Sequence, residues 1–223
     1  MADPALHVKD LRFTHAGGAF ALDVPELRVE AGEHVLLAGG SGRGKSTLLQ
    51  LVAGLRDPQS GSIEVGGVRM TALEGAARDR ARGRCIGMVF QTFNLLHGFT
   101  AAENLLAALM FSDVPAAQHE ERALGLLKSL GIPDPDADVD RLSVGQQQRV
   151  AVARALAARP ALVLADEPTA SLDPTHAAEA MDLIQQACRE AGAALLCTSH
   201  DPAMRGRFAR VEDIERFARG AAA

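Results

Sequence analysis

One short segment restricts the fold of this chain more than any other feature. Residues 39–46 read GGSGRGKS; they follow the apolar run 34–38 and lead into the helically spaced leucines of residues 45–55. A glycine-rich turn between a buried strand and a helix can aim consecutive backbone N–H groups at a single anion. The segment therefore predicts a phosphate-binding loop in an α/β protein. A chance glycine turn is disfavoured because the flanking strand and helix that the motif requires are both present.

Two side chains of this loop predict how a phosphate chain would be held. Lys45, one of three lysines in the chain, is expected to neutralise the β- and γ-phosphates, and the Ser46 hydroxyl is expected to ligate Mg²⁺. The residues expected to surround the nucleotide are Gly39, Gly40, Ser41, Gly42, Arg43, Gly44, Lys45, Ser46 and Thr47.

A pair of acidic residues follows the apolar run 161–165. Because ligands gather at the carboxyl ends of parallel strands, Asp166 and Glu167 should reach the phosphate loop. Asp166 is expected to hold Mg²⁺ through water, and Glu167 to orient and deprotonate an attacking water. The alternative is a solvated acidic turn before Pro168.

Length and composition limit the remaining possibilities. The 223 residues predict one large domain, or one domain with an inserted subdomain. A net charge of −5 argues against a nucleic-acid partner. No apolar run approaches the ~18–20 residues that span a bilayer, and residues 1–4 are unlike a signal peptide, so we expect a cytoplasmic protein. The three cysteines lack metal-ligand spacing and are expected to be reduced, buried thiols.

Strand-like and helix-like patterns alternate along the chain. This alternation predicts a mostly parallel sheet with helices on both faces. Two helix starts are marked by caps: Thr100, with Glu103 three positions later, and Ser143. The expected elements are a hairpin at 61–70, a strand at 85–90, a helical stretch at 100–130, a helix from 143 to about 158, a strand at 161–165, a helix at about 175–190 and a strand at 193–198.

Residues 142–149, LSVGQQQR, complete a series of motifs that resembles the ATP-binding cassette (ABC) ATPases of transporters. After the phosphate loop come a Q-loop glutamine at Gln91, this signature segment, the acidic pair, a D-loop at 171–173 (Ser171-Leu172-Asp173) and a switch histidine at His200. The resemblance covers essentially the whole chain. It implies one ABC ATPase domain over residues 1–223: an α/β fold with a P-loop (RecA-like) core, an antiparallel β-subdomain and an α-helical subdomain inserted near residues 92–158.

The resemblance also implies a chemistry. ATP would be bound with Mg²⁺, ligated by Ser46, Gln91 and Asp166, and His200 would contact the γ-phosphate. The residues implied in catalysis are Glu167, His200, Gln91 and Lys45. The helix that Ser143 caps would meet the γ-phosphate of ATP bound by a second copy of the chain, in a head-to-tail dimer. The residues implied in binding that nucleotide are Ser143, Gly145, Gln146 and Asp173.

Two positions depart from the family pattern. Val144 stands where the family's LSGGQ signature has glycine, while Ser143 and Gly145 are retained, so we expect a functional site with altered packing. The family usually stacks adenine on an aromatic residue, often tyrosine, and this chain has no tyrosine. His15 best fits that place; it either stacks on the base or is an ordinary loop residue.

The implied function is that of an ATP-hydrolysing subunit that drives a separate transmembrane permease from the cytoplasmic face of the inner membrane. The permease's coupling helix would dock in a groove beside Gln91 and the helical insert. Residues 89–96 and Glu103-Asn104 resemble the lipoprotein-releasing, macrolide-efflux and cell-division branch. The alternatives are a cassette that transmits conformational change without moving a solute, a non-transport ABC ATPase, and a P-loop kinase or GTPase, which would lack the signature helix and the switch histidine.

Overall fold

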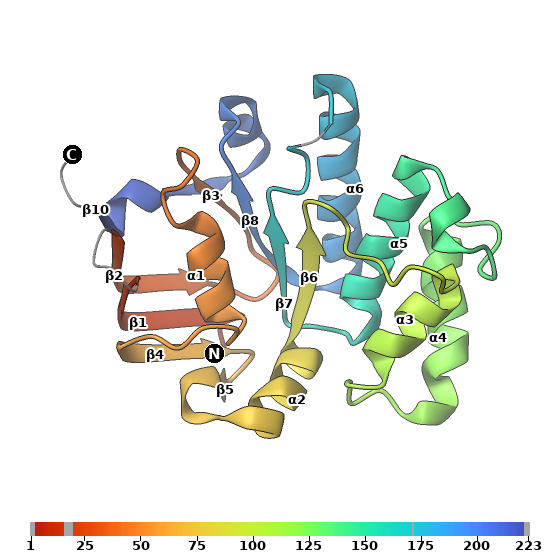
Figure 1. Cartoon of the computed structure of the whole chain (residues 1–223), viewed down its shortest axis with the longest axis horizontal. Helices are drawn as coiled ribbons and strands as arrows, with labels where there is room; N and C mark the ends of the chain where they lie inside the picture. The colour runs from red at the N-terminus through yellow and green to blue at the C-terminus, as the bar shows by residue number, and fades with distance from the viewer. Residues whose placement is uncertain (1–2, 16–19, 171, 221–223) are drawn as a thin grey trace.

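The computed structural model describes residues 3–15, 20–170 and 172–220. These residues form an antiparallel sheet and a parallel sheet, side by side in Figure 1. The antiparallel sheet has the order β10-β2-β1-β4-β5: β1 Leu6–Thr14, β2 Phe20–Val29, β4 Ser60–Val65, β5 Val68–Arg69 and β10 Ala218–Gly220. The parallel sheet has the order β6-β7-β8-β3-β9: β3 His34–Ala38, β6 Ile86–Phe90, β7 Leu162–Asp166, β8 Ala194–Ser199 and β9 Arg210–Asp213.

Helices pack on these sheets and on one another. The α-helices are α1 Lys45–Val52, α2 Gly75–Cys85, α3 Ala101–Leu109, α4 His119–Ser129, α5 Val144–Ala157 and α6 Pro174–Ala191. Short 3₁₀ helices are η1 Met70–Ala72, η2 Ala116–Gln118, η3 Val139–Arg141, η4 Pro202–Arg207 and η5 Ile214–Arg216. None of the helices in the described part of the chain is both long and apolar enough to cross a membrane.

The central parallel strands separate two hydrophobic clusters because successive side chains of a strand point to opposite faces. On one face Leu162 and Leu164 of β7 pack in a cluster with α1 and the antiparallel sheet. On the other face Val163 and Ala165 pack with α5 and α6. Both faces are covered, which explains why β7 and β8 are almost entirely apolar in sequence.

Helices α3, α4 and α5 contact one another at the end of the molecule away from the antiparallel sheet (Figure 1). Both predicted caps are present: Thr100 and Glu103 form a capping box at the start of α3, and Ser143 and Gln146 form one at the start of α5. Each cap satisfies backbone N–H groups that have no partner inside the helix.

The structure differs from the sequence-based expectation in two elements. The helical stretch at 100–130 is broken between Leu109 and His119, because Pro115 disfavours a helical conformation at the residue before it. Cys85 ends α2 and does not begin a strand. The basic residues before it belong to that helix, where alanine and arginine are both good helix formers.

Candidate active site

The phosphate loop joins β3 to α1 and owes its shape to glycines with positive φ. Gly39, Gly42 and Gly44 have φ of 147°, 73° and 95°. A Cβ atom built on Gly39 would lie 2.4 Å from Ile214 Cγ2, so glycine is needed there for space as well. Lys45 follows Gly44, with its side chain only 3% exposed. Its Nζ donates to the carbonyl oxygens of Gly39 (2.8 Å) and Gly40 (2.9 Å), which fixes the ammonium beneath the loop.

The loop opens onto a cavity of about 390 Å³ that collects sequence-predicted residues from four segments. The loop and the first turn of α1 line one side of it, Gln91 directly follows β6, and Glu167 directly follows β7. The cavity is lined by His15, Ser41, Gly42, Gly44, Lys45, Ser46, Thr47, Gln91 and Glu167. Gly39 and Gly40 lie on the other side of the loop, beside His200, and Arg43 is exposed.

The acidic pair sits where parallel-sheet topology places it, across from the phosphate loop. Asp166 Oδ1 accepts hydrogen bonds from Ser46 Oγ (3.0 Å) and Thr198 Oγ1 (2.7 Å). Hydroxyl, amide and carboxylate oxygens are the ligands Mg²⁺ prefers, so Ser46, Gln91 and Asp166 fit that ion.

Glu167 lies between the side chains of Lys45 and His200. Its Oε1 is 3.1 Å from Lys45 Nζ, and its Oε2 is 2.7 Å from His200 Nδ1. The backbone of Glu167 is left-handed, with φ of 45°, a conformation unfavourable for a residue with a Cβ. Its N–H donates to Thr198 Oγ1 at 2.9 Å, which helps to hold the turn.

His15 lies at the rim of the same cavity. Its ring meets that of Phe13 edge-on, with the centroids 5.4 Å apart and an interplanar angle of 83°. Arg56 lies over the Phe13 ring, 6.0 Å from its centroid. The neighbouring residues 16–19 lie outside the described residues.

The signature residues do not reach this cavity within one chain. Ser143, Val144 and Gly145 line a separate cavity of about 380 Å³ against α6. Ser143 Oγ accepts from Gln146 N at 3.3 Å, and Gln146 Oε1 accepts from Ser143 N at 3.0 Å. Val144 is 58% exposed, so most of its side chain is not packed within its own chain. The start of α5 is thus an open helix N-terminus.

The D-loop position is described only in part, since Ser171 lies outside the described residues. Asp173 caps α6 by accepting from the backbone N–H groups of Thr175 (3.1 Å) and His176 (3.3 Å), and it pairs with the His176 imidazole. The hydrogen bond and the charge of Asp173 raise the pKa of His176, and the reverse contact lowers the pKa of Asp173.

Two residues in contact with the site were missed by sequence reasoning. Thr198 touches both acidic residues, and its only signal was a polar side chain at the end of an otherwise apolar strand. Glu215 accepts a hydrogen bond from Gly40 N at 3.2 Å across 175 residues of sequence, and no local pattern marks it.

A phosphate loop after β3, an acidic pair at the end of β7 two strands away in the same parallel sheet, and a capped helix with an open N-terminus define a P-loop nucleotide hydrolase. A sequence profile of the ABC transporter family matches residues 22–170, and the chain belongs to that family. It is an ATP-binding cassette, the ATPase subunit of an ABC transporter.

Individual relatives agree with this assignment. The lipoprotein-releasing system ATP-binding protein LolD of Anaeromyxobacter dehalogenans is 42% identical over 220 residues, which is 96% of this chain and 92% of that protein. The methionine import ATP-binding protein MetN of Rhodopseudomonas palustris is 43% identical over 185 residues, 82% of this chain and 50% of that protein. The dimeric structure of the bacterial ABC transporter cassette MJ0796 superposes with a TM-score of 0.78 at 30% identity, covering 98% of this chain and 99% of that one.

Proposed function

We propose that this chain is the ATPase of a lipoprotein-releasing type of ABC system and that the phosphate-loop cavity is its Mg-ATP site. The observation that carries the site is the contact of Glu167, which lines that cavity, with both Lys45 and His200. The type of system is supported by the 42% identity to a LolD protein over almost the whole length of both chains.

The contacts suggest how the roles are divided. Lys45 is the point charge for the β- and γ-phosphates, and Ser46, Gln91 and Asp166 hold Mg²⁺. When bound, the ion neutralises charge on the phosphate oxygens. Glu167 orients the attacking water and accepts its proton, and His200 holds the Glu167 carboxylate in place and meets the γ-phosphate. His15 stacks on adenine at the rim.

The second half of the site comes from another copy of the chain. Ser143, Gly145, Gln146 and Asp173 lie away from the phosphate-loop cavity of their own chain, at or near the starts of α5 and α6. A helix N-terminus with free N–H groups suits a phosphate. These residues therefore complete the ATP site of the partner cassette.

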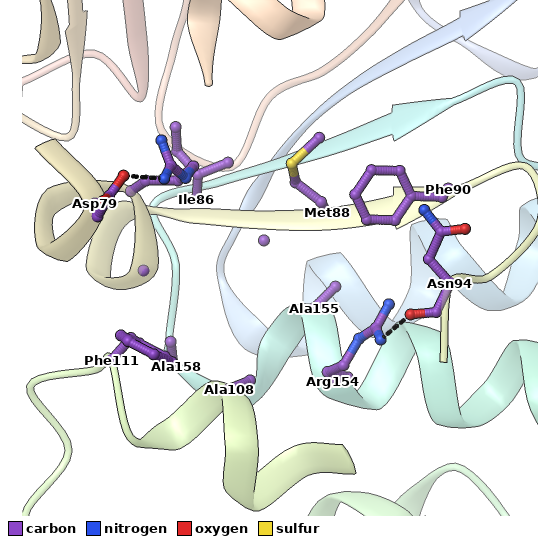
Figure 2. Close-up of a pocket in the computed structure, with 13 residues that line it drawn as sticks. Asp79, Ile86, Met88, Phe90, Asn94, Ala108, Phe111, Arg154, Ala155 and Ala158 are labelled. Carbon is purple, nitrogen blue, oxygen red and sulfur yellow. Dashed lines mark hydrogen bonds and ion pairs between the residues drawn. The ribbon is translucent and has the colours of Figure 1, made fainter. Parts of the chain in front are cut away.

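The permease has a suitable docking groove beside Gln91. A cavity of about 510 Å³ lies between α2, β6, α3 and α5 (Figure 2). Phe111 lines it and is 59% exposed, and the adjacent Met110 is 76% exposed. We place the permease's coupling segment there, with the residues near 92–158 acting as the helical subdomain. That contact would hold the chain at the cytoplasmic face of the membrane.

The first prediction tests the catalytic assignment. Glu167→Gln should retain ATP binding but hydrolyse ATP at least ~100-fold more slowly, because a positioned base is lost while the phosphate contacts remain. It should also accumulate as an ATP-bound dimer, measured by light scattering. Glu190→Gln, an exposed change on α6, is the control and should leave turnover unchanged. Wild-type turnover in Glu167→Gln would remove Glu167 from the role of base.

The type of system needs a separate experiment. The tagged full chain is purified from detergent-solubilised membranes with its permease, and the complex is reconstituted into liposomes. A lipid-modified protein should stimulate its ATPase rate, whereas the same protein without its lipid should not. Equal rates under both conditions would contradict the lipoprotein-releasing assignment and leave the ATPase assignment intact.

A further inference from the structure

The segment that follows Gln91 has an unusual backbone. Phe93 and Asn94 are consecutive residues with φ of 58° and 49°. Asparagine tolerates the left-handed region, but a bulky residue such as phenylalanine rarely enters it. A local hydrogen bond from Asn94 N to Thr92 O (2.6 Å) tightens the turn. Something outside this segment must hold it in that conformation.

The side chain that does so is Arg154, which reaches the segment from α5. Its Nη2 donates to Phe93 O at 2.7 Å and its Nη1 donates to Asn94 O at 2.5 Å; Figure 2 shows the second contact. The planar guanidinium presents two parallel donors, which suits two successive carbonyl oxygens. Within the described ranges Arg154 has no carboxylate partner, and its burial lowers its pKa. The hydrogen bonds of this partly desolvated cation therefore go to two backbone oxygens.

The same side chain lines the docking groove. Arg154 and Asn94 are both part of its wall, together with Phe90 at the end of β6. Gln91 follows Phe90 directly and lines the ATP cavity. The groove and the ATP cavity are therefore separated only by the chain around Gln91. Arg154 hydrogen-bonds the residues that follow Gln91 from the side of the groove.

We propose that Arg154 is a positioning residue: by clamping the carbonyl groups of Phe93 and Asn94 it holds Gln91 in the ATP cavity. Strand β6 fixes the chain before Gln91, and Arg154 fixes the chain after it. The proposal rests on the role assigned to Gln91 in the proposed function.

Arg154→Lys is the principal test. Lysine keeps the positive charge but cannot bond both carbonyls in one plane. We expect kcat of the full-length protein to fall about tenfold while the KM for ATP stays within about twofold, since Gln91 acts in hydrolysis and the phosphate contacts are intact. Hydrogen exchange of the amides at 92–96 should accelerate about tenfold or more.

Arg122→Lys is the matched control. Arg122 of α4 also spans two consecutive carbonyl oxygens, donating to Ala157 O and to Leu156 O (2.9 Å), and burial also lowers its pKa. It does not touch the segment after Gln91. This variant should keep both kcat and the exchange rate at 92–96.

A rescue variant separates positioning from simple structural support. Glycine adopts the left-handed region without the cost that a Cβ imposes. Phe93→Gly should therefore restore part of the kcat that Arg154→Lys loses, because it removes the residue for which the left-handed conformation is costly, without restoring the hydrogen bonds of Arg154. Failure of this rescue would overturn the proposal, and so would unchanged kcat and exchange in Arg154→Lys.

Gln91→Ala separates a failure of the Arg154 clamp from a failure of the role proposed for Gln91 in hydrolysis. Slow turnover in Gln91→Ala together with normal turnover in Arg154→Lys would overturn the clamp and leave the ATP site as assigned. Normal turnover in Gln91→Ala would remove Gln91 from the site and overturn both the proposed role and the clamp.

Discussion

At the scale of single residues, one hydroxyl group, that of Thr198, holds both Asp166 and Glu167 in position. Thr198 is fully buried, donates to Asp166 Oδ1 and accepts from Glu167 N. It thereby fixes the carboxylate next to Ser46 and the left-handed turn at Glu167. Thr198 is a positioning residue for both.

The second prediction concerns this hydroxyl. Thr198→Val keeps the shape but leaves Glu167 N without its acceptor. The free energy of unfolding should fall by about 1–3 kcal/mol, the usual cost of an unsatisfied buried polar group. Turnover should fall about tenfold, because the Glu167 carboxylate is less well oriented. Urea denaturation and a steady-state ATPase assay measure the two effects, and a variant equal to wild type in both would contradict this role.

The third prediction follows from the pair at the start of α6. The pKa of His176 is raised above its ordinary value of 6.5 by Asp173. Its contribution to stability is therefore fully present below about pH 6.5 and is lost as pH rises through the raised pKa. An NMR titration should give His176 a pKa above 6.5, and Asp173→Asn should return it toward that value. Both side chains are exposed, so the effect on unfolding should be small.

At the scale of elements, the distance between β6 and α5 is set by a glycine. A Cβ atom on Gly87 would lie 2.1 Å from Ala155 O, which belongs to the backbone of α5 and cannot move as a side chain would. The crossing is therefore closer than any other residue type would permit. It also brings Arg154, the neighbour of Ala155, within reach of the segment that follows β6.

The fourth prediction uses two glycines with opposite surroundings. Gly87→Ala should lower the free energy of unfolding by about 1–3 kcal/mol through overpacking. A Cβ atom added to Gly125, in α4, would have nothing within 4 Å, so Gly125→Ala should raise stability by about 0.5–1 kcal/mol by favouring the helix. Denaturant titrations of both variants check the pair; equal effects of the same sign would contradict it.

The elements that sequence predicted best are those whose cause is local. The capping box at Thr100, the N-cap at Ser143 and the apolar strand at 161–165 each depend on residues within a few positions of one another. The contacts of Thr198, Glu215 and Arg154 join segments that are 31 to 175 positions apart, and only the fold brings them together. The break between α3 and α4 was not predicted, because the apolar spacing continues across it and Pro115 was given too little weight.

At the scale of the whole molecule, the proposed function assigns the two halves of an ATP site to two separate cavities of the chain. The phosphate-loop cavity and the signature cavity have separate linings. Hydrolysis should therefore depend on the meeting of two cassettes, with Val144 at the seam between them.

The fifth prediction tests this arrangement. Ser143→Arg should bind ATP normally as a monomer but lose hydrolysis, because the larger arginine side chain would fill the space that the partner's bound phosphate needs. Val144→Gly should keep turnover within a few-fold, since the side chain between Ser143 and Gly145 need not touch phosphate, although it should cost ~0.5–1 kcal/mol of stability at the helix start. ATPase rates against protein concentration check both. Normal hydrolysis by Ser143→Arg would exclude the head-to-tail arrangement.

The order of strands in the parallel sheet has a consequence for synthesis on the ribosome. Strand β3, which leads into the phosphate loop, is flanked by β8 and β9, and both are translated more than 150 residues later. Glu215, which bonds the loop itself, emerges later still. A nascent chain therefore carries an unfinished phosphate loop until residues 194–215 have been made. Truncated products of interrupted translation should not compete with the finished subunit for cellular ATP.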